Sequence, residues 1–237
     1  MTFRPTKRVP LHFLLLNLAL TASLLCQFAA AQAPAAATDP SKLTLERIFD
    51  SNEFQPAGFG GFRWLKEGNT YARLERSATV NGGLDLVRYQ IGSNARDVLL
   101  PAEKLIPKGE MKPLSIQGYE WSADERRALI YTNSQKVWRL NTRGDYWVLE
   151  LATGKLSKLG GDAKPSTLMF AKFSPDGSRV GYVRENDLYV ENLETGKITR
   201  LTSNGSPTMV NGTSDWVNEE EFNLRDCWRW SPDSKSI

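Results

Sequence analysis

The sequence has very little histidine and cysteine. Its 237 residues include one histidine, His12, and two cysteines, Cys26 and Cys227. His12 and Cys26 lie in the N-terminal leader defined below, so the rest of the chain has no imidazole. This excludes a Ser-His-Asp triad and a histidine-ligated metal site there. A single remaining cysteine cannot form an internal disulfide, and we expect Cys227 to be a small apolar residue in a strand beside Trp228.

An excess of charge of one sign is also missing. The whole chain has 30 basic and 27 acidic residues, but Arg4, Lys7 and Arg8 belong to the leader, which contains no acid. Without those three, the basic residues number 27 and equal the acidic ones. A balanced charge gives no footprint for nucleic acid, so no nucleic-acid partner is expected. No pattern in the sequence indicates a cofactor or a metal.

One long hydrophobic run is present, and it lies at the N-terminus. The basic residues named above precede an apolar stretch from Leu11 to Phe28, and Ala29-Ala30-Ala31 fits a cleavage site. Residues 1–31 are therefore predicted to be a signal peptide, which implies export to the periplasm or out of the cell. A retained membrane anchor is the alternative, because the run is almost long enough to span a bilayer.

Two short segments follow the leader. Residues 32–42 are rich in alanine and proline and are predicted to be a linker. Leu43–Phe49 has helical spacing and is predicted to be a short lead-in helix.

The rest of the chain repeats. Four segments align on an aromatic residue followed by a turn, and these aromatic residues are 57, 52 and 57 positions apart; they are Trp64, Trp121, Phe173 and Trp230. In the third segment the turn is Ser174-Pro175-Asp176-Gly177, in which proline and aspartate favour a tight turn. Units of about 50 residues with about four strands each predict an all-β fold, a β-propeller of about four blades over residues 43–237. A β-sandwich is the alternative.

An acidic cluster interrupts the last repeat. Glu219, Glu220 and Glu221 lie between the aromatic residues Trp216 and Phe222. Such a cluster is often a solvated acidic turn. If it instead faces a cleft, it favours a cation, and a primary ammonium can be shared by two carboxylates. On a strand neighbouring acids would point to opposite faces, so we expect a short helical turn, with Asp215 as its cap.

This stretch resembles a known motif. Asp215-Trp216-Val217-Asn218-Glu219-Glu220-Glu221-Phe222, followed by Trp230-Ser231-Pro232-Asp233, is similar to the glutamate motif of the dipeptidyl peptidase IV family, among the prolyl-oligopeptidase-like serine peptidases. The resemblance implies that Glu220 and Glu221 bind the free amino terminus of a peptide. Asn218 departs from the family, which often has an aromatic residue there.

The resemblance points to a second binding element. Trp138-Arg139 matches a Trp-Arg pair that precedes a strand in the family, where the arginine binds the backbone carbonyl of the second peptide residue. Arg139 is therefore the expected counterpart, although Leu140 replaces the histidine that frequently follows. Stacking of Arg139 on Trp138, or an ion pair with a surface acid, is the alternative. Arg143 is a competitor with a poorer match.

The resemblance also implies a catalytic domain outside this sequence. In the family an α/β-hydrolase domain follows the propeller and carries the catalytic Ser, Asp and His. This sequence has no Gly-x-Ser-x-Gly motif, so no catalytic residue is assigned and the chain alone is expected to be inactive. We therefore expect the truncated, substrate-binding propeller of an exported serine dipeptidyl aminopeptidase that removes X-Pro or X-Ala dipeptides. Family members commonly dimerise, so a homodimer is among the expected assemblies.

Two other functions fit parts of the pattern. A periplasmic propeller that serves only as a protein-interaction module would explain the generic Ser-Pro-Asp turns. A pseudo-peptidase would bind amino termini without cutting. The acidic cluster and Trp138-Arg139 distinguish these readings, because a plain interaction module needs neither.

Overall fold

The computed structural model describes residues 39, 41–55, 61–93 and 95–237. The chain separates into two units, residues 1–59 and 60–237, which are described one at a time. The predicted signal peptide, residues 1–31, and most of the linker, residues 32–42, lie outside the described residues. Within those residues, none of the helices has the length and apolar character needed to cross a bilayer.

The described part of the first unit contains one short helix. The sequence predicted a helix over Leu43–Phe49, and the structure has the π-helix η1 at Glu46–Asp50. The Thr44 hydroxyl accepts a 3.3 Å hydrogen bond from the Arg47 backbone N–H near its start, and Arg47 pairs with Glu53 beyond its end. The lead-in helix is thus present but begins later than predicted.

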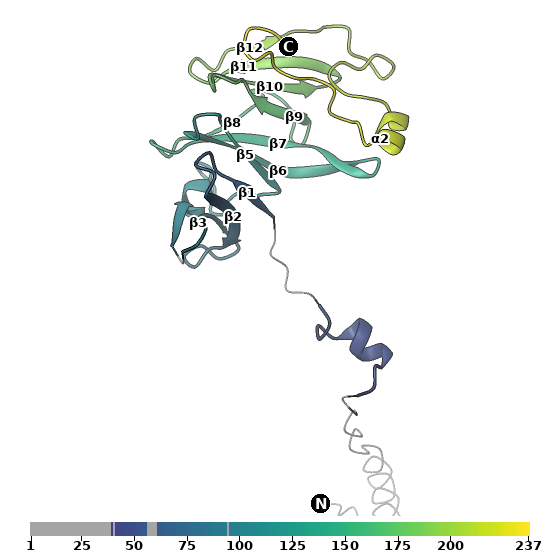
Figure 1. Cartoon of the computed structure of the whole chain (residues 1–237). Coiled ribbons are helices and arrows are strands. Elements are labelled where there is room, and N and C mark those ends of the chain that lie inside the picture. Colours follow the sequence, from purple (N-terminus) through teal and green to yellow (C-terminus); the bar gives the residue numbers. More distant parts are fainter. Residues whose placement is uncertain (1–38, 40, 56–60, 94) are drawn as a thin grey trace, which may run out of the picture. The chain divides into compact units, whose positions relative to one another are not determined.

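The second unit is built from antiparallel four-stranded repeats, which follow one another through the molecule in Figure 1. The first repeat contains β1 Phe62–Trp64, β2 Thr70–Arg76, β3 Leu84–Gln90 and β4 Arg96–Leu100, followed by the 3-10 helix η2 Ala102–Leu105. The second contains β5 Gly118–Trp121, β6 Arg127–Val137, β7 Leu140–Glu150 and β8 Leu156–Lys158. The third contains β9 Leu168–Phe173, β10 Arg179–Arg184, β11 Asp187–Asn192 and β12 Ile198–Arg200. The helix α2 Trp216–Phe222 follows them.

The second and third repeats join into one eight-stranded sheet through a single pair of strand residues. Gly144 of β7 pairs with Leu168 of β9. A side chain at position 144 would clash, because its Cβ would lie 2.3 Å from the Tyr131 ring. Glycine at this position is therefore required by the packing of β7 against Tyr131 of the neighbouring strand β6, within the second repeat.

The hydrophobic core is divided among the junctions between successive repeats. Leu86 and Leu105 of the first repeat pack with Ile130 and Leu149 of the second. A further cluster joins the second and third repeats, and a smaller one joins the third repeat to Trp228. A sandwich would have one core between two sheets, whereas here each repeat buries its faces against its neighbours. The predicted repeat architecture is confirmed.

The same turn recurs at the start of each later repeat. Asp124, Asp176 and Asp233 each accept a hydrogen bond from the serine hydroxyl two residues earlier, at 2.6, 2.6 and 2.7 Å respectively. Arginines after two of these turns link neighbouring repeats, because Arg127 donates to the Gly177 carbonyl at 3.1 Å and Arg179 to the Ser234 carbonyl at 2.6 Å. The Ser-x-Asp spacing thus marks both the turn and the junction.

The fourth aromatic segment differs from its prediction. Trp228–Ser234 is not a strand, and within the described residues it has no ladder partner. Trp230 docks on the third repeat by donating from its indole N–H to the Lys172 carbonyl at 3.2 Å. Cys227 is an exposed free thiol, so its prediction as a small apolar residue in a strand is wrong. Trp64 is also 55% exposed and packs edge-on against the Phe62 ring, so this aromatic position is less buried than the repeat suggests.

A substitution at Gly181 tests the packing of Trp228 against the third repeat. A Cβ at this position would lie 2.6 Å from the Trp228 ring. We expect Gly181→Ala to lower the free energy of unfolding by about 1–3 kcal/mol, the usual cost of overpacking. Urea denaturation of both proteins measures the difference. Gly118→Ala is the control, because its Cβ would lie an ordinary 3.7 Å from Tyr131. An unchanged unfolding midpoint for Gly181→Ala would show that Trp228 does not pack as described.

The contribution of Asp176 to the stability of the turn should depend on pH, and this can be tested. The Ser174 hydroxyl and the Ser178 backbone N–H bond its carboxylate and lower its pKa to about 2 from 3.8. A lowered folded-state pKa means that this stabilisation is complete above about pH 4 and disappears as the pH falls through 2. We expect Asp176→Asn to lose less stability between pH 4 and pH 2 than the wild type, measured by thermal unfolding. Equal losses in both proteins would contradict this, and Glu194→Gln controls for removal of an exposed charge.

Candidate functional site

A long hairpin carries the Trp138-Arg139 pair away from its sheet. The strands β6 and β7 have 11 residues each, whereas β5 and β8 have 4 and 3. Their register shifts between Thr132 and Gln135, an irregularity that bends and twists a ladder. Val137 pairs with Leu140, so Trp138 and Arg139 form a two-residue turn at the tip. Trp138 has a φ of +56°, a left-handed conformation that is rare for a bulky residue.

The acidic cluster lies on an excursion of residues 212–227. Its base is closed by a β-bridge between Thr213 and Asp226 and by a 3.3 Å hydrogen bond from Ser214 N to the Arg225 carbonyl. Asp215 caps α2, because its carboxylate accepts a 2.9 Å hydrogen bond from Asn218 N. This bond lowers the pKa of Asp215. The predicted helical turn and its cap are confirmed.

The three glutamates occupy different environments. Successive residues on a helix point about 100° apart, so three neighbours cannot face the same way. Glu219 is buried, with 4% of its surface exposed. Glu220 has a side chain that is 6% exposed, while Glu221 is exposed. A uniformly solvated acidic turn is therefore not what the structure contains.

Glu220 meets the predicted arginine. Its Oε2 lies 2.6 Å from Nε of Arg139, whose side chain is 77% exposed. The other oxygen of Glu220, Oε1, is buried and has no hydrogen-bond partner in the described part of the chain. The structure thus brings Arg139 and Glu220 together. The buried Oε1 of Glu220 shares its lack of a hydrogen-bond partner with both carboxylate oxygens of Glu219, which have Arg225 as their ion-pair partner. Glu221 makes no recorded hydrogen bond or ion pair with any described residue, and neither does the competitor Arg143 through its side chain.

Arg225 is the site residue that the sequence did not reveal. Its Nε lies 3.3 Å from Oε2 of Glu219, and its guanidinium lies 4.1 Å from the centre of the Trp138 ring. Burial lowers its pKa, and the attraction to Glu219 opposes that effect. The one available signal was a basic residue soon after the acidic run. Stacking on Trp138, the alternative role considered for Arg139, is therefore made by Arg225 instead.

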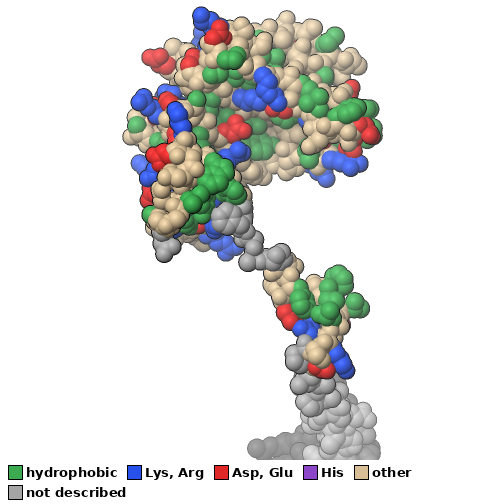
Figure 2. All heavy atoms as spheres, in the orientation of Figure 1, with side chains coloured by type: hydrophobic (Ala, Val, Ile, Leu, Met, Phe, Trp, Pro, Cys, Tyr) green, Lys and Arg blue, Asp and Glu red, His purple; other side chains and the backbone are tan. Residues whose placement is uncertain are grey.

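Exposed apolar side chains surround these charges. Trp216, Val217 and Phe222 of α2 are 50%, 51% and 72% exposed, and Trp138 is 44% exposed. Figure 2 shows hydrophobic and acidic side chains together at the edge where Figure 1 has α2, beside the end of the β6–β7 hairpin. Low-polarity surroundings strengthen interactions between nearby charges.

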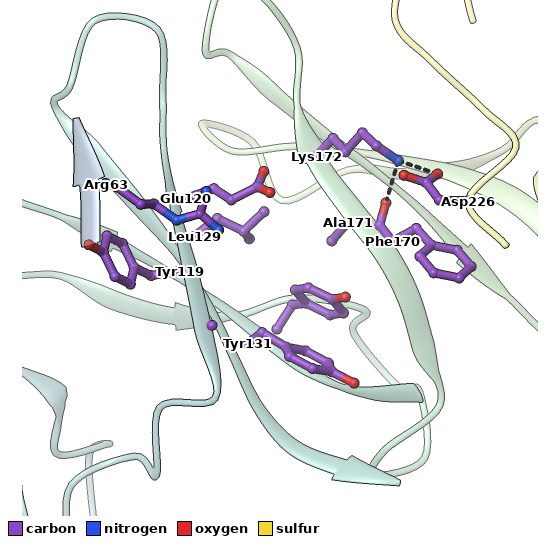
Figure 3. A pocket seen from close by; sticks show the side chains of 11 residues that line it. Arg63, Tyr119, Glu120, Leu129, Tyr131, Phe170, Ala171, Lys172 and Asp226 are labelled. Carbon is purple, nitrogen blue, oxygen red and sulfur yellow. Dashed lines mark hydrogen bonds and ion pairs between the residues drawn. The ribbon is translucent and has the colours of Figure 1, made fainter. Parts of the chain in front are cut away.

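A pocket of about 260 Å³ lies between the repeats, and none of the three predicted site residues lines it. Figure 3 shows Arg63, Glu120 and Lys172 along it, which are the middle residues of three aligned aromatic segments. Lys172 donates to Asp226 at 2.5 Å and lies 4.1 Å from the centre of the Trp228 ring. Burial lowers the pKa of Lys172 despite this partner. Among the described residues, no cluster of acids and cysteines is arranged to hold a metal.

Residues 122–237 match the family model for the Dipeptidyl peptidase IV (DPP IV) N-terminal region. The resemblance to the dipeptidyl peptidase IV family is thereby confirmed. The matched range contains the hairpin tip and the whole excursion of residues 212–227.

Individual relatives cover more of the chain. It is 35% identical over 153 residues to dipeptidyl peptidase 4 of Trichophyton rubrum and likewise to that of Arthroderma otae, matching 64% of this chain and 18% of each relative. The crystal structure of Porphyromonas gingivalis dipeptidyl peptidase 4 superposes with a TM-score of 0.68 at 26% identity, over 81% of this chain and 26% of that one. The fold is thus that of a propeller in the N-terminal region of the dipeptidyl peptidase IV family, and the chain spans about a fifth of the curated relatives.

Substitutions at Glu219 and Glu221 test whether one acid is buried and the other exposed. Glu219→Met leaves the Arg225 charge buried without its partner, and we expect it to lower the free energy of unfolding by about 3–5 kcal/mol. Glu221→Gln changes an exposed side chain and should alter stability by less than about 0.5 kcal/mol. Chemical denaturation of both variants measures these changes. Equal effects would mean that the two acids are equally exposed.

Proposed function

We propose that this chain is the substrate-binding propeller of an exported serine dipeptidyl aminopeptidase that removes X-Pro or X-Ala dipeptides from peptide amino termini. In this proposal Glu220 and Glu221 bind the peptide ammonium, and Arg139 binds the backbone carbonyl of the second peptide residue. The cutting is assigned to an α/β-hydrolase domain of the same protein, and the propeller sets where the cut falls.

The observation that carries the proposal is the open oxygen of Glu220. A buried carboxylate oxygen without a hydrogen bond is costly, because it has lost water without gaining a donor. A peptide α-ammonium has three donors and a pKa of about 8, so it is mostly charged at neutral pH. It would give Oε1 the donor that no described residue supplies, while Arg139 continues to hold Oε2.

Glu221 and Arg139 extend the proposed contact along the peptide. Glu221 follows Glu220 on α2 and is exposed, so its carboxylate is free to approach a cation that Glu220 already holds. Arg139 makes no other ion pair or side-chain hydrogen bond with a described residue, and a guanidinium has five donors. Its remaining donors can bind a backbone carbonyl, which fixes the distance from the amino terminus to the second peptide bond.

The test measures, by titration calorimetry, the binding of alanyl-proline amide to the purified chain. Acetylation of the peptide amine should abolish binding, since it removes the charge that Glu220 requires. Glu220→Gln should weaken binding roughly tenfold or more, as expected for losing a charged hydrogen bond of about 1.5–3 kcal/mol. Glu221→Gln should weaken it less, because an exposed charge is screened by water.

Glu194→Gln is the matched control, because Glu194 lies on an exposed turn of the third repeat. It should bind the peptide as the wild type does. Undiminished binding of the acetylated peptide, or wild-type affinity in Glu220→Gln, would refute the assignment.

A second candidate is a propeller that acts only as a protein-interaction module. The exposed apolar residues of α2 favour it, since such surfaces suit protein contacts. This candidate predicts peptide binding that does not depend on a free amine, so the acetylated peptide separates the two functions.

A further inference from the structure

The hairpin tip has little support of its own. Trp138, Arg139 and Leu140 are all exposed, with Trp138 44% and Leu140 45% exposed. Among the described residues the tip makes two contacts with the 212–227 excursion: Arg225 lies on the Trp138 ring, and Glu220 pairs with Arg139. A tip with so few packed atoms would be mobile without them.

These two contacts are not equivalent. Arg139 is 77% exposed at its side chain, so its pair with Glu220 borders on solvent. Arg225 is 9% exposed, and its guanidinium lies between the buried Glu219 and the indole of Trp138. An ion pair shielded from water is screened far less than an exposed one. The Arg225 contact is therefore the firmer of the two.

Arg225 is itself anchored on both sides. Its carbonyl accepts from Ser214 N at 3.3 Å, which holds the base of the excursion. The next residue, Asp226, pairs with Lys172 of β9 at 2.5 Å and forms the bridge with Thr213. The backbone at Arg225 is thus fixed relative to the third repeat, while the ring that its guanidinium contacts belongs to the second repeat.

We propose that Arg225 is a positioning residue that holds the Trp138 indole so that the adjacent Arg139 meets Oε2 of Glu220 and leaves Oε1 open. This role rests on the proposed function, because the position of Arg139 matters only if Glu220 takes a ligand. Arg225 does not touch the ligand. It acts by holding the Trp138 ring, which in turn sets the position of the adjacent Arg139.

Arginine suits this role for a geometric reason. A guanidinium is planar, so it can lie on an indole face while its edge pairs with a carboxylate. Lysine keeps the charge that Glu219 needs but has no plane to stack. Arg225→Lys therefore separates the positioning role from the ion pair, and the protein should remain folded.

The first experiment measures the tip without any ligand. Acrylamide quenching of tryptophan fluorescence is compared between proteins with and without Trp138, using Trp138→Phe, so that the difference reports on this ring. In Arg225→Lys the Trp138 contribution should become more accessible to quencher than in the wild type. The control Arg229→Lys changes an exposed arginine two residues beyond the excursion, keeps the charge that pairs with Asp226, and should leave the Trp138 contribution unchanged. Unchanged quenching in Arg225→Lys would overturn the proposal.

The second experiment measures alanyl-proline amide binding in a double-mutant cycle. Arg225→Lys should weaken binding roughly tenfold, within the range that direct contacts between residues contribute. In an Arg139→Ala background it should have no additional effect, since the positioned group is gone. A purely structural role would weaken binding equally in both backgrounds and would overturn the proposal.

The outcomes separate this inference from the function it rests on. If the wild type fails to bind the peptide, the proposed function fails, whatever the quenching shows. If the wild type binds, Glu220→Gln weakens binding and Arg225→Lys binds normally, only the positioning role fails.

Discussion

Two neighbouring residues at a hairpin tip meet two acids on a separate excursion, and this double contact defines the candidate site. The Arg225 guanidinium lies over the Trp138 ring and pairs with Glu219, while Arg139 pairs directly with Glu220. The two segments belong to different repeats and come together because consecutive repeats bury their faces against one another. The packing between repeats therefore sets the geometry of the charges, which have no rigid support of their own.

The acidic cluster is stable because its members do not share one environment. Like charges on one helical turn repel each other, and burial increases this cost. Here Glu219 has a buried cationic partner, Glu220 has an exposed one, and Glu221 faces solvent. Each neutralised neighbour reduces the repulsion felt by the next. One buried oxygen of Glu220 has no hydrogen-bond donor among the described residues.

The repeated turns are determined mostly by residues that are close together in the sequence. A serine, an aspartate two residues later and an arginine beyond fix the turn, and the arginine then bonds to the following repeat. Such a pattern is visible in sequence because every partner within the turn is close along the chain. The inter-repeat bond is not visible in this way, since its acceptor is a backbone carbonyl some 50 residues away.

The sequence by itself determined the all-β repeat, its turns, the capped helical turn at Asp215, and the identity of the acids and of Arg139 as candidates. These follow from periodicity, turn chemistry and motif, all of which act over short distances along the chain. Tertiary structure alone decided that the glutamates differ in burial, that Arg139 meets Glu220 rather than Trp138, and that Arg225 takes the indole face. Those outcomes depend on the bend of the β6–β7 hairpin and on the docking of one repeat against the next, which bring together residues far apart in the chain.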